Sequence, residues 1–562
     1  MLKKRRHPHK SNVLLVNITR LGDILQATPT IAGIKMENPE CKVTVLVEKQ
    51  FGDICYYMPD IDEVYTLDLG MTVRSITRGG EGLIDAYEYI DEVVQDLKQR
   101  GFDYALNMSS SAYTALLLKL LNINRLGGWS SDEEGYRVIE SDWARLFATS
   151  VFHRNRFFNS LNLVDMFRCS ADVELHPLQL KVAVNKEEEE KAAALLREAQ
   201  FSNQGPLIAI HCGASQTKRQ WGLPRFVALT KLLLNELSAR VILTGSKKEA
   251  PFVALIAEEV KDKNVFVSAG KTSVPTLAAL LKECDILVCG DTGPMHLSVA
   301  VGTPVISLFL ASAYGYETGP YSEGNIVLQP VVSCGPCNPN KPCAKPICHE
   351  CITPQLITSL IKIKLRGDIN SLPKDFVPQD QLIIYSTIFD KWGFYDMKPL
   401  TSTASDPYIN LRYSYRAMWL DDIGGIIDND LLQAAEAEGS KKKLNILSSI
   451  EGIEELIEWA KRGQDLIVKL IKLIKDERSP AYLLKEVNTA LADCDKKIEY
   501  LGYKYEWLGP LSRMFLFAKE ALSGSDPLSL ASQMGEAYRT LERRSKKLIK
   551  YYSIISKEGV RL

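Results

Sequence analysis

Short β-rich runs alternate with longer helical patterns along the first two thirds of the chain, and this alternation constrains the fold more than any other feature. Between residue 12 and about residue 180 the β-rich runs are NVLLVNI, KVTVLVE, EVYTLDL and DYALNM. Such alternation is typical of a parallel sheet whose strands are joined by crossover helices. It predicts a Rossmann-like N-terminal lobe over residues 12–200.

The same pattern starts again after the polar helical segment NKEEEEKAAALLREAQ. The second series of β-rich runs is LIAIH, RVILTG, NVFVSAG, DILVCG and TPVISLF. We therefore expect a second Rossmann-like lobe over residues 201–366, and the predicted fold class is α/β.

Beyond residue 366 the pattern changes to a loop-rich connector, predicted over residues 367–415, and then to nearly continuous helical periodicity over residues 416–562. In DLIVKLIKLIKDE, Ile467 and Leu470 share an apolar face while Lys469 points away from it. A basic amphipathic helix of this kind packs in its own bundle or lies on a membrane or partner. We expect a separate helical region that serves oligomer assembly or placement at the acceptor.

The composition is that of a soluble globular protein, with 46% hydrophobic residues, 24% charged residues and a net charge of −1. Because the charge is balanced, no nucleic acid partner is expected. A basic tail over residues 1–11 is followed by the seven-residue apolar run NVLLVNI, which leads into TRLGD without a small-residue cleavage site, so no secretory signal is expected. No stretch approaches the roughly 20 apolar residues that a membrane span needs. We expect a cytoplasmic protein whose tail is either solvated or in peripheral contact with the inner membrane.

The first motif whose residues could take part in binding or catalysis is TRLGDILQATPTI at residues 19–31. Its Gly-containing turn ends the first predicted strand, and Asp23 stands at the start of the next helix. Ligands of such sheets bind at the carboxyl ends of the strands, so this carboxylate is a candidate for the site. The alternative is that Asp23 only caps the helix.

The second motif is GDTGPMHLSVAVGTP at residues 290–304, directly after the strand DILVC. Asp291, Thr292 and Gly293 form the turn, and the helix is predicted to begin near Pro294. The amides at such a helix start can bind phosphate, which predicts a diphosphate site. His296 on the first helical turn faces either the ligand or the core.

The third and fourth motifs are two further loops that end strands of the second lobe. HCGASQTKRQWGLPRF at residues 211–226 combines cations and hydroxyls, including Ser215 and Arg219, which suit a leaving diphosphate. LTGSKKE at residues 243–249 offers Ser246 and Glu249 to a nucleotide ribose. A solvated basic loop is the alternative for the first of the two.

The order and spacing of TRLGD, GAS with KRQW, GSKKE and DTGPMH resemble glycosyltransferase family 9, the heptosyltransferases, over roughly residues 12–365. The resemblance implies two facing Rossmann-like lobes of the GT-B type and an ADP-activated heptose donor. It also implies inverting transfer, without a catalytic metal, to a hydroxyl of a lipopolysaccharide-core or related acceptor. The alternatives are another nucleotide sugar, a protein acceptor, and a catalytically degenerate protein that binds nucleotide or glycan in an assembly.

Residue by residue, the resemblance implies that Asp23 is the general base and that Asp291 faces the sugar. It implies that Ser215 and Arg219 bind the phosphates. Thr292, Gly293 and His296 are implied to surround the diphosphate.

Five of the twelve cysteines lie in CGPCNPNKPCAKPICHEC, at Cys334, Cys337, Cys343, Cys348 and Cys351. Four thiolates at such spacing can close a structural zinc or iron site, and the alternative is free thiols or a disulfide. The two CxxC pairs by themselves select Cys334, Cys337, Cys348 and Cys351. The resemblance, to the autotransporter-modifying branch of the family, implies Cys334, Cys337, Cys343 and Cys351 instead.

Overall fold

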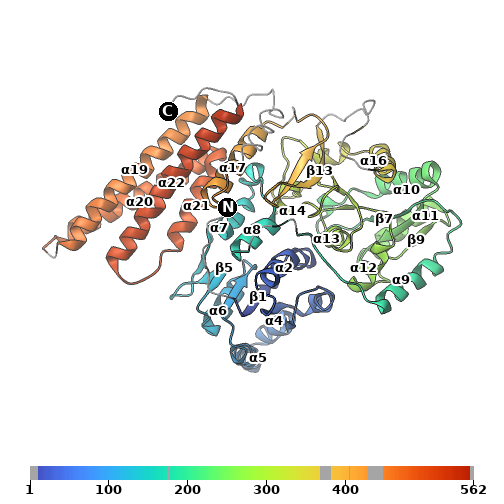
Figure 1. Ribbon diagram of the computed structural model, residues 1–562, viewed down its shortest axis with the longest axis horizontal. Helices are drawn as coiled ribbons and strands as arrows, with labels where there is room; N and C mark the ends of the chain where they lie inside the picture. Colours follow the sequence, from blue (N-terminus) through green and yellow to red (C-terminus); the bar gives the residue numbers. More distant parts are fainter. Residues whose placement is uncertain are drawn as a thin grey trace.

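Two sheets, each covered by helices, form two lobes, and a helical arm extends from the first lobe (Figure 1). The computed structural model describes residues 10–367 apart from 174, 175 and 177, together with residues 372, 381–403, 406–427, 447–476 and 478–556. The expectations for residues 1–9 of the basic tail lie outside the described residues. Lys10, the next residue, is buried in the first lobe, where its ammonium lies 5.2 Å from the centre of the Tyr104 ring.

The first lobe is a six-stranded sheet with the strand order β3-β2-β1-β4-β5-β6. The strands are β1 (Asn12–Asn17), β2 (Lys42–Glu48), β3 (Glu63–Leu67), β4 (Tyr104–Asn107), β5 (Leu126–Ser131) and β6 (Arg137–Ile139). The helices are α1 (Leu21–Leu25), α2 (Thr28–Glu37), α3 (Gly52–Cys55), α4 (Leu69–Arg78), α5 (Glu81–Gln99), α6 (Ala112–Leu121), α7 (Asp142–Ser150) and α8 (Leu163–Ser170). The strands β1 to β5 pair in parallel, so the predicted Rossmann-like lobe is confirmed.

The second lobe is an eight-stranded sheet with the order β14-β13-β12-β11-β10-β7-β8-β9. Its parallel strands are β7 (Leu207–His211), β8 (Arg240–Thr244), β9 (Val265–Val267), β10 (Ile286–Gly290), β11 (Val305–Leu308) and β12 (Ile326–Pro330). Its helices are α9 (Lys186–Glu198), α10 (Leu223–Leu237), α11 (Ala250–Val260), α12 (Val274–Lys282), α13 (Gly293–Ala300), α14 (Gly315–Thr318), α15 (Ile347–Glu350) and α16 (Pro354–Arg366). The second Rossmann-like lobe is therefore confirmed as well.

The boundary between the lobes lies before α9 and not at residue 200. Helix α9 packs along α12 of the second lobe, and Glu198 and Glu189 pair with Lys271 and Lys282 at 2.6 and 2.8 Å. The predicted boundary falls after α9 because a polar sequence does not show which lobe its ion pairs reach.

The predicted loop-rich connector is wrong for residues 382–399. Strands β13 (Leu382–Phe389) and β14 (Tyr395–Pro399) form an antiparallel hairpin that extends the second sheet beyond β12. Five residue pairs join β12 to β13, from Ile326 with Ser386 to Pro330 with Leu382. The second sheet is thus completed by chain that follows the last Rossmann-like helix.

The helical region is not a separate unit, because it shares a hydrophobic core with the first lobe. Helix α17 (Ile409–Asp422) begins before the predicted residue 416 and buries Tyr415 and Met418 against Phe158 and Met166 of the first lobe. It is buried nearly all round, so its sequence lacks the one-sided polarity of a surface helix.

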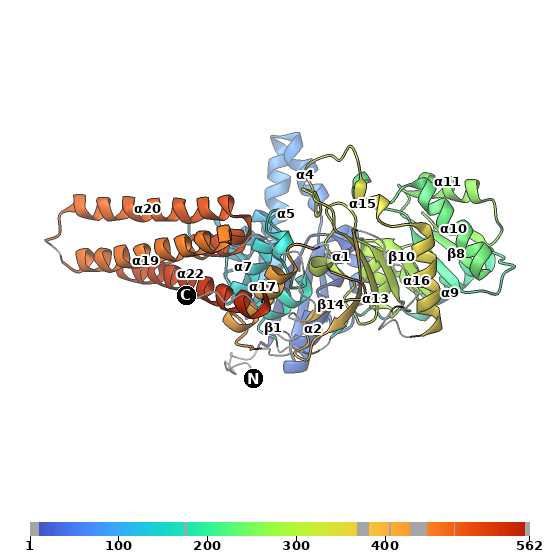
Figure 2. The same ribbon diagram turned by 90° about the horizontal axis from the view of Figure 1, so that it is seen from above.

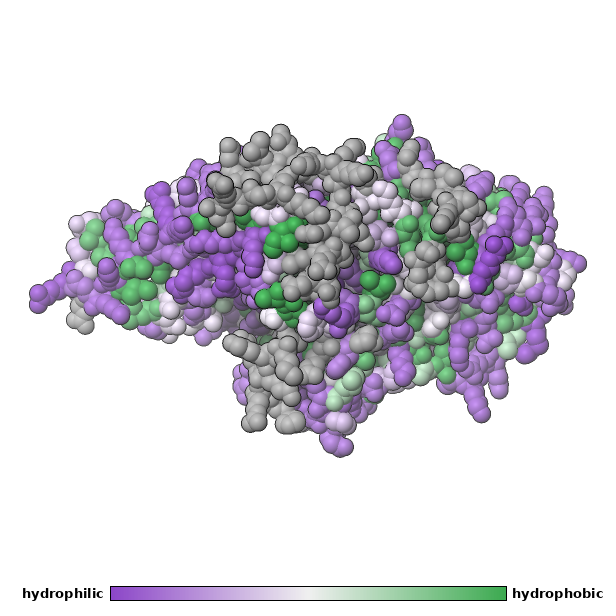
Figure 3. All heavy atoms as spheres, turned by 45° about the horizontal axis from the view of Figure 1, so that its top comes forward, coloured by the Kyte–Doolittle hydropathy of each residue, from purple (hydrophilic) through white to green (hydrophobic). Residues whose placement is uncertain are grey.

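The arm consists of α19 (Leu447–Lys475), α20 (Ala481–Lys504), α21 (Gly509–Glu520) and α22 (Pro527–Ser556), which pack against one another. Helices α19, α20 and α22 lie side by side in Figure 2. In α19, Ile467 and Leu470 are buried while Lys469 is exposed, so the prediction that this helix packs in a bundle is confirmed. Hydrophilic side chains cover much of the visible surface of the arm (Figure 3). None of the helices in the described part of the chain has the length and apolar character that crossing a bilayer requires.

Candidate active site

The site lies where α1 of the first lobe meets α13 of the second. A Cβ atom built on Gly22 would lie 2.9 Å from Cδ2 of His296, and one built on Gly293 would lie 3.1 Å from Cδ2 of Leu21. The glycines of RLGD and DTGP thus permit a close approach of the two helix starts. Two motifs about 270 residues apart in the sequence therefore face each other, as the predicted arrangement of facing lobes requires.

Asp23 is the third residue of α1, which begins at Leu21. Its Oδ2 accepts a hydrogen bond of 3.3 Å from the backbone N–H of Arg20, so it does contribute to capping. Burial raises the pKa of the Asp23 carboxyl, and the nearby carboxylate of Asp291 raises it further. A carboxylate with a raised pKa accepts a proton more readily near neutral pH, so capping and a role as general base are compatible.

Arg219 joins the third motif to the second. Its Nη2 donates to Oδ2 and to the backbone oxygen of Asp291, at 2.5 and 2.6 Å, and its Nη1 donates to Oγ of Ser215 at 3.3 Å. The side chains of Arg219 and Asp291 are each only 14% exposed. The structure therefore brings three of the predicted site residues together, and a guanidinium has further N–H donors for a phosphate.

Helix α13 begins at Gly293, one residue before the predicted start, with Thr292 as its N-cap. The hydroxyl of Thr292 donates to the backbone oxygen of Gly290 at 3.3 Å and makes no capping bond to the helix. The first amides of α13 and the ion pair of Asp291 with Arg219 thus lie at the same end of the second sheet. Such a helix start favours an anionic ligand.

His296 faces the first lobe. Burial lowers the pKa of its imidazole to about 4, so the ring is neutral at physiological pH. Its Nδ1 has no hydrogen-bond partner among the described residues. The ring therefore packs at the contact between the lobes and holds one unused polar atom there.

The fourth motif packs onto the third. Oε2 of Glu249 accepts hydrogen bonds of 2.8 Å from both the N–H and the hydroxyl of Ser246. Oε1 of Glu249 lies 1.9 Å from where a Cβ on Gly213 would be. Ser246 and Glu249 therefore form one unit against the GAS loop, and its contact with a ribose stays a prediction.

A buried ion pair lies near these residues that the sequence pattern does not predict. Nε of Arg156 lies 2.6 Å from Oε2 of Glu317 in α14, and Nη1 of Arg156 donates to the backbone oxygen of Ser312 at 2.6 Å. Burial raises the pKa of Glu317, with a smaller contribution from Asp291. The pair joins the two lobes beside the site, and no motif marks either residue because they lie 161 positions apart.

The cysteine loop, residues 334–351, lies beside the third motif and holds no disulfide, since all twelve cysteines are described and free. Burial raises the pKa of Cys337 to about 11, with contributions from Cys334, Cys348 and Cys343. Cys351 interacts with Cys348. Within the described ranges, no three His, Cys, Asp or Glu side chains are already arranged to hold a metal ion.

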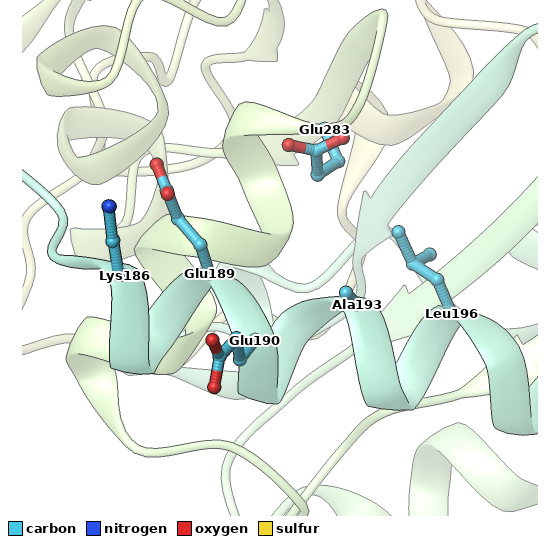
Figure 4. Close-up of a pocket in the computed structure, with 6 residues that line it drawn as sticks. All are labelled: Lys186, Glu189, Glu190, Ala193, Leu196 and Glu283. Carbon is cyan, nitrogen blue, oxygen red and sulfur yellow. The ribbon is translucent and has the colours of Figure 1, made fainter.

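A surface hollow between α9 and α12 is unrelated to this site (Figure 4). Its lining consists of Lys186, Glu189, Glu190, Ala193, Leu196 and Glu283. No motif residue contributes to it, and its three carboxylates disfavour a diphosphate.

Residues 90–347 match the family model for glycosyltransferase family 9 (heptosyltransferase). Over these residues the chain is similar to glycosyltransferase family 9. Lipopolysaccharide heptosyltransferase 3 of Escherichia coli K12 is 24% identical over 314 residues, which cover 54% of this chain and 84% of the relative. Lipopolysaccharide heptosyltransferase 1 of Campylobacter coli is 22% identical over 308 residues, which cover 53% and 84%.

The fold of family 9 agrees with the structure. The crystal structure of the glycosyltransferase family 9 protein from Veillonella parvula DSM 2008 superposes with a TM-score of 0.50 at 18% identity, covering 64% of this chain and 98% of that protein. The family-model match and the curated relatives together show a glycosyltransferase that is similar to the heptosyltransferases. The arm from α19 onward lies outside the residues that the family model matches.

Proposed function

We propose that this glycosyltransferase transfers heptose, with inversion, from ADP-heptose to a hydroxyl of a lipopolysaccharide-core or related glycan. The observation that carries the proposal is the approach of α1 to α13, which brings Asp23 opposite the Asp291 to His296 turn. The names of the Escherichia coli and Campylobacter coli relatives support the heptose donor and the lipopolysaccharide acceptor.

In the proposed reaction, Asp23 takes the proton of the acceptor hydroxyl as its oxygen attacks the anomeric carbon. The bond from that carbon to the diphosphate oxygen breaks on the opposite face of the sugar, and its electron pair stays with the departing ADP. The amides at the start of α13 and the guanidinium of Arg219 stabilise the charge that develops there. These groups supply the positive charge, so the proposed mechanism uses no catalytic metal.

The donor and acceptor are tested with the full-length protein. ADP-heptose and UDP-, GDP- and CDP-sugars are compared by thermal shift, because a ligand that binds only the folded state raises its apparent stability. ADP release is then measured with lipopolysaccharide-core acceptors, and the product's anomeric configuration is determined by NMR. Turnover with ADP-heptose and an inverted anomer supports the proposal. Turnover only with another nucleotide sugar, or only with a protein acceptor, contradicts it.

We also propose a structural zinc or iron ion in the cysteine loop. The donor chemistry fits, since thiolates bind both metals, and four thiolates leave no position for substrate. The two predicted ligand sets share Cys334, Cys337 and Cys351 and differ in whether Cys343 or Cys348 is the remaining ligand. Reducing purification followed by elemental analysis should find about one metal ion per chain. Cys337→Ser should lose the metal, whereas one of the two variants Cys343→Ser and Cys348→Ser should keep it. A metal-free and fully folded preparation contradicts the site.

A further inference from the structure

Lys218 lies between the donor site and the cysteine loop, and its side chain is bound to the loop. Its Nζ lies 2.8, 2.9 and 2.6 Å from the backbone oxygens of Asn338, Pro339 and Lys341. An ammonium group has three N–H donors, so these three carbonyls satisfy it fully. Gln216, two residues earlier, donates to the same oxygen of Pro339 at 3.2 Å.

The main chain of Lys218 is bound to the loop as well. Nε2 of His349, which is buried, donates to the backbone oxygen of Lys218 at 2.9 Å. The loop itself is attached to the second lobe, where the N–H of Cys337 donates to the backbone oxygen of Ala311 at 2.9 Å. Residue 218 is therefore held through its side chain and its backbone by the segment that contains the cysteines.

The neighbouring residue is Arg219, which contacts Asp291 in the donor site. Lys218 and Arg219 both belong to the short 3-10 turn Thr217–Arg219. In a turn of three residues, holding the backbone at one position limits the backbone at the next, and this limits the directions in which Arg219 can point.

We propose that Lys218 is a positioning residue of the donor site, which makes donor affinity depend on the conformation of the cysteine loop. Bound to the loop carbonyls, Lys218 holds the turn so that Arg219 points to the start of α13. The proposal rests on the proposed function in one respect, namely that the donor carries a nucleoside diphosphate. Lys218 is not itself a phosphate ligand here, because its three donors are used by carbonyl oxygens.

The first test is Lys218→Met, which keeps the length of the side chain and removes the ammonium. ADP binding, measured by titration calorimetry, should weaken by about 5- to 150-fold, which is the usual range for coupling between two sites. The matched control is Lys345→Met, which removes the same charge from an exposed position of the same loop and should leave ADP affinity unchanged. Wild-type affinity in Lys218→Met overturns the proposal.

A double-mutant cycle with Arg219→Ala separates positioning from direct contact. If Lys218 acts through Arg219, adding Lys218→Met to Arg219→Ala causes no further loss of ADP affinity. Additive losses show that Lys218 binds the diphosphate itself, and they overturn the proposal.

A measurement on the wild-type protein covers the case in which Lys218→Met does not fold. Coupling between two sites is reciprocal, so ADP must slow amide hydrogen exchange in residues 334–349 if the loop controls ADP binding. If the protein binds ADP but amide hydrogen exchange in the loop is unchanged, the coupling is overturned and the proposed function is not. A wild-type protein that does not bind ADP overturns the proposed function as well.

Discussion

The two lobes follow the same alternation of strands and helices but contribute different chemistry to the site. The second lobe supplies cations, hydroxyls and a helix start from several strand-end loops, among them Arg219, Ser215 and the first turn of α13. The first lobe supplies one carboxylate, Asp23, from the short helix α1. Donor binding should therefore depend on the second lobe and proton removal on the first, so that changes in the two lobes affect different measurements.

The largest expected effect comes from the first lobe. Asp23→Asn keeps the shape of the side chain but cannot take up the acceptor proton, so transfer should fall by about a hundredfold to ten-thousandfold. ADP affinity should not change, because the nucleotide is proposed to bind to the other lobe. Transfer rate and ADP titration measure the two effects separately.

The matched control for Asp23 is Asp53→Asn, which makes the same change in the first turn of α3 at an exposed position. It should leave transfer unchanged. Near-normal turnover of Asp23→Asn would show that this residue only caps α1.

The next effect concerns how the first lobe is supported by the arm. Arg544 of α22 is 4% exposed and pairs with Asp422 and Asp142 at 2.7 Å each. Breaking such a buried pair costs about 3 to 5 kcal/mol, and the low end applies here because Asp422 also pairs with Arg543. Arg544→Met should lower the thermal midpoint clearly, whereas Arg539→Met on the exposed side of α22 should not. Equal midpoints in the two variants contradict this support role.

The third effect comes from the second lobe. Arg219→Ala should weaken ADP binding by about 1.5 to 3 kcal/mol, roughly 10- to 150-fold, and slow transfer with it. The control is Arg240→Ala, at the start of β8 and thus at the opposite end of the sheet. Unchanged ADP affinity in Arg219→Ala would remove this residue from the donor site.

The smallest effect concerns the contact between the lobes. Because the pKa of His296 is about 4 in the folded protein and about 6.5 when unfolded, the unfolded chain binds more protons between these values. Stability should therefore fall as the pH is lowered from 7 to 5, with His296 contributing up to about 2 kcal/mol. Urea midpoints at the two pH values should fall less for His296→Gln than for the wild type. The same fall in both proteins would show that His296 is not desolvated at the contact.

The strand-end motifs show what local sequence can predict about the site. Asp23, Ser215, Arg219, Asp291 and His296 all follow strands that the sequence pattern identifies, and the carboxyl ends of parallel strands meet at one edge of a sheet. Their convergence could be predicted from topology alone. The ion pair of Arg219 with Asp291 could not, because it depends on side-chain positions in two different loops.

The sequence by itself determined the two Rossmann-like lobes and the site at the ends of their strands, because hydrophobic periodicity and turn residues act over a few neighbouring positions. Only the tertiary structure decided that β13 and β14 complete the second sheet and that α17 is buried against the first lobe. The tertiary structure also decided the pairing of Arg156 with Glu317 and the binding of Lys218 to the cysteine loop. Among these contacts, Pro330 and Leu382 lie 52 positions apart in the sequence, and Phe158 and Tyr415 lie 257 positions apart. The free energy of each contact depends on a partner that no local pattern specifies.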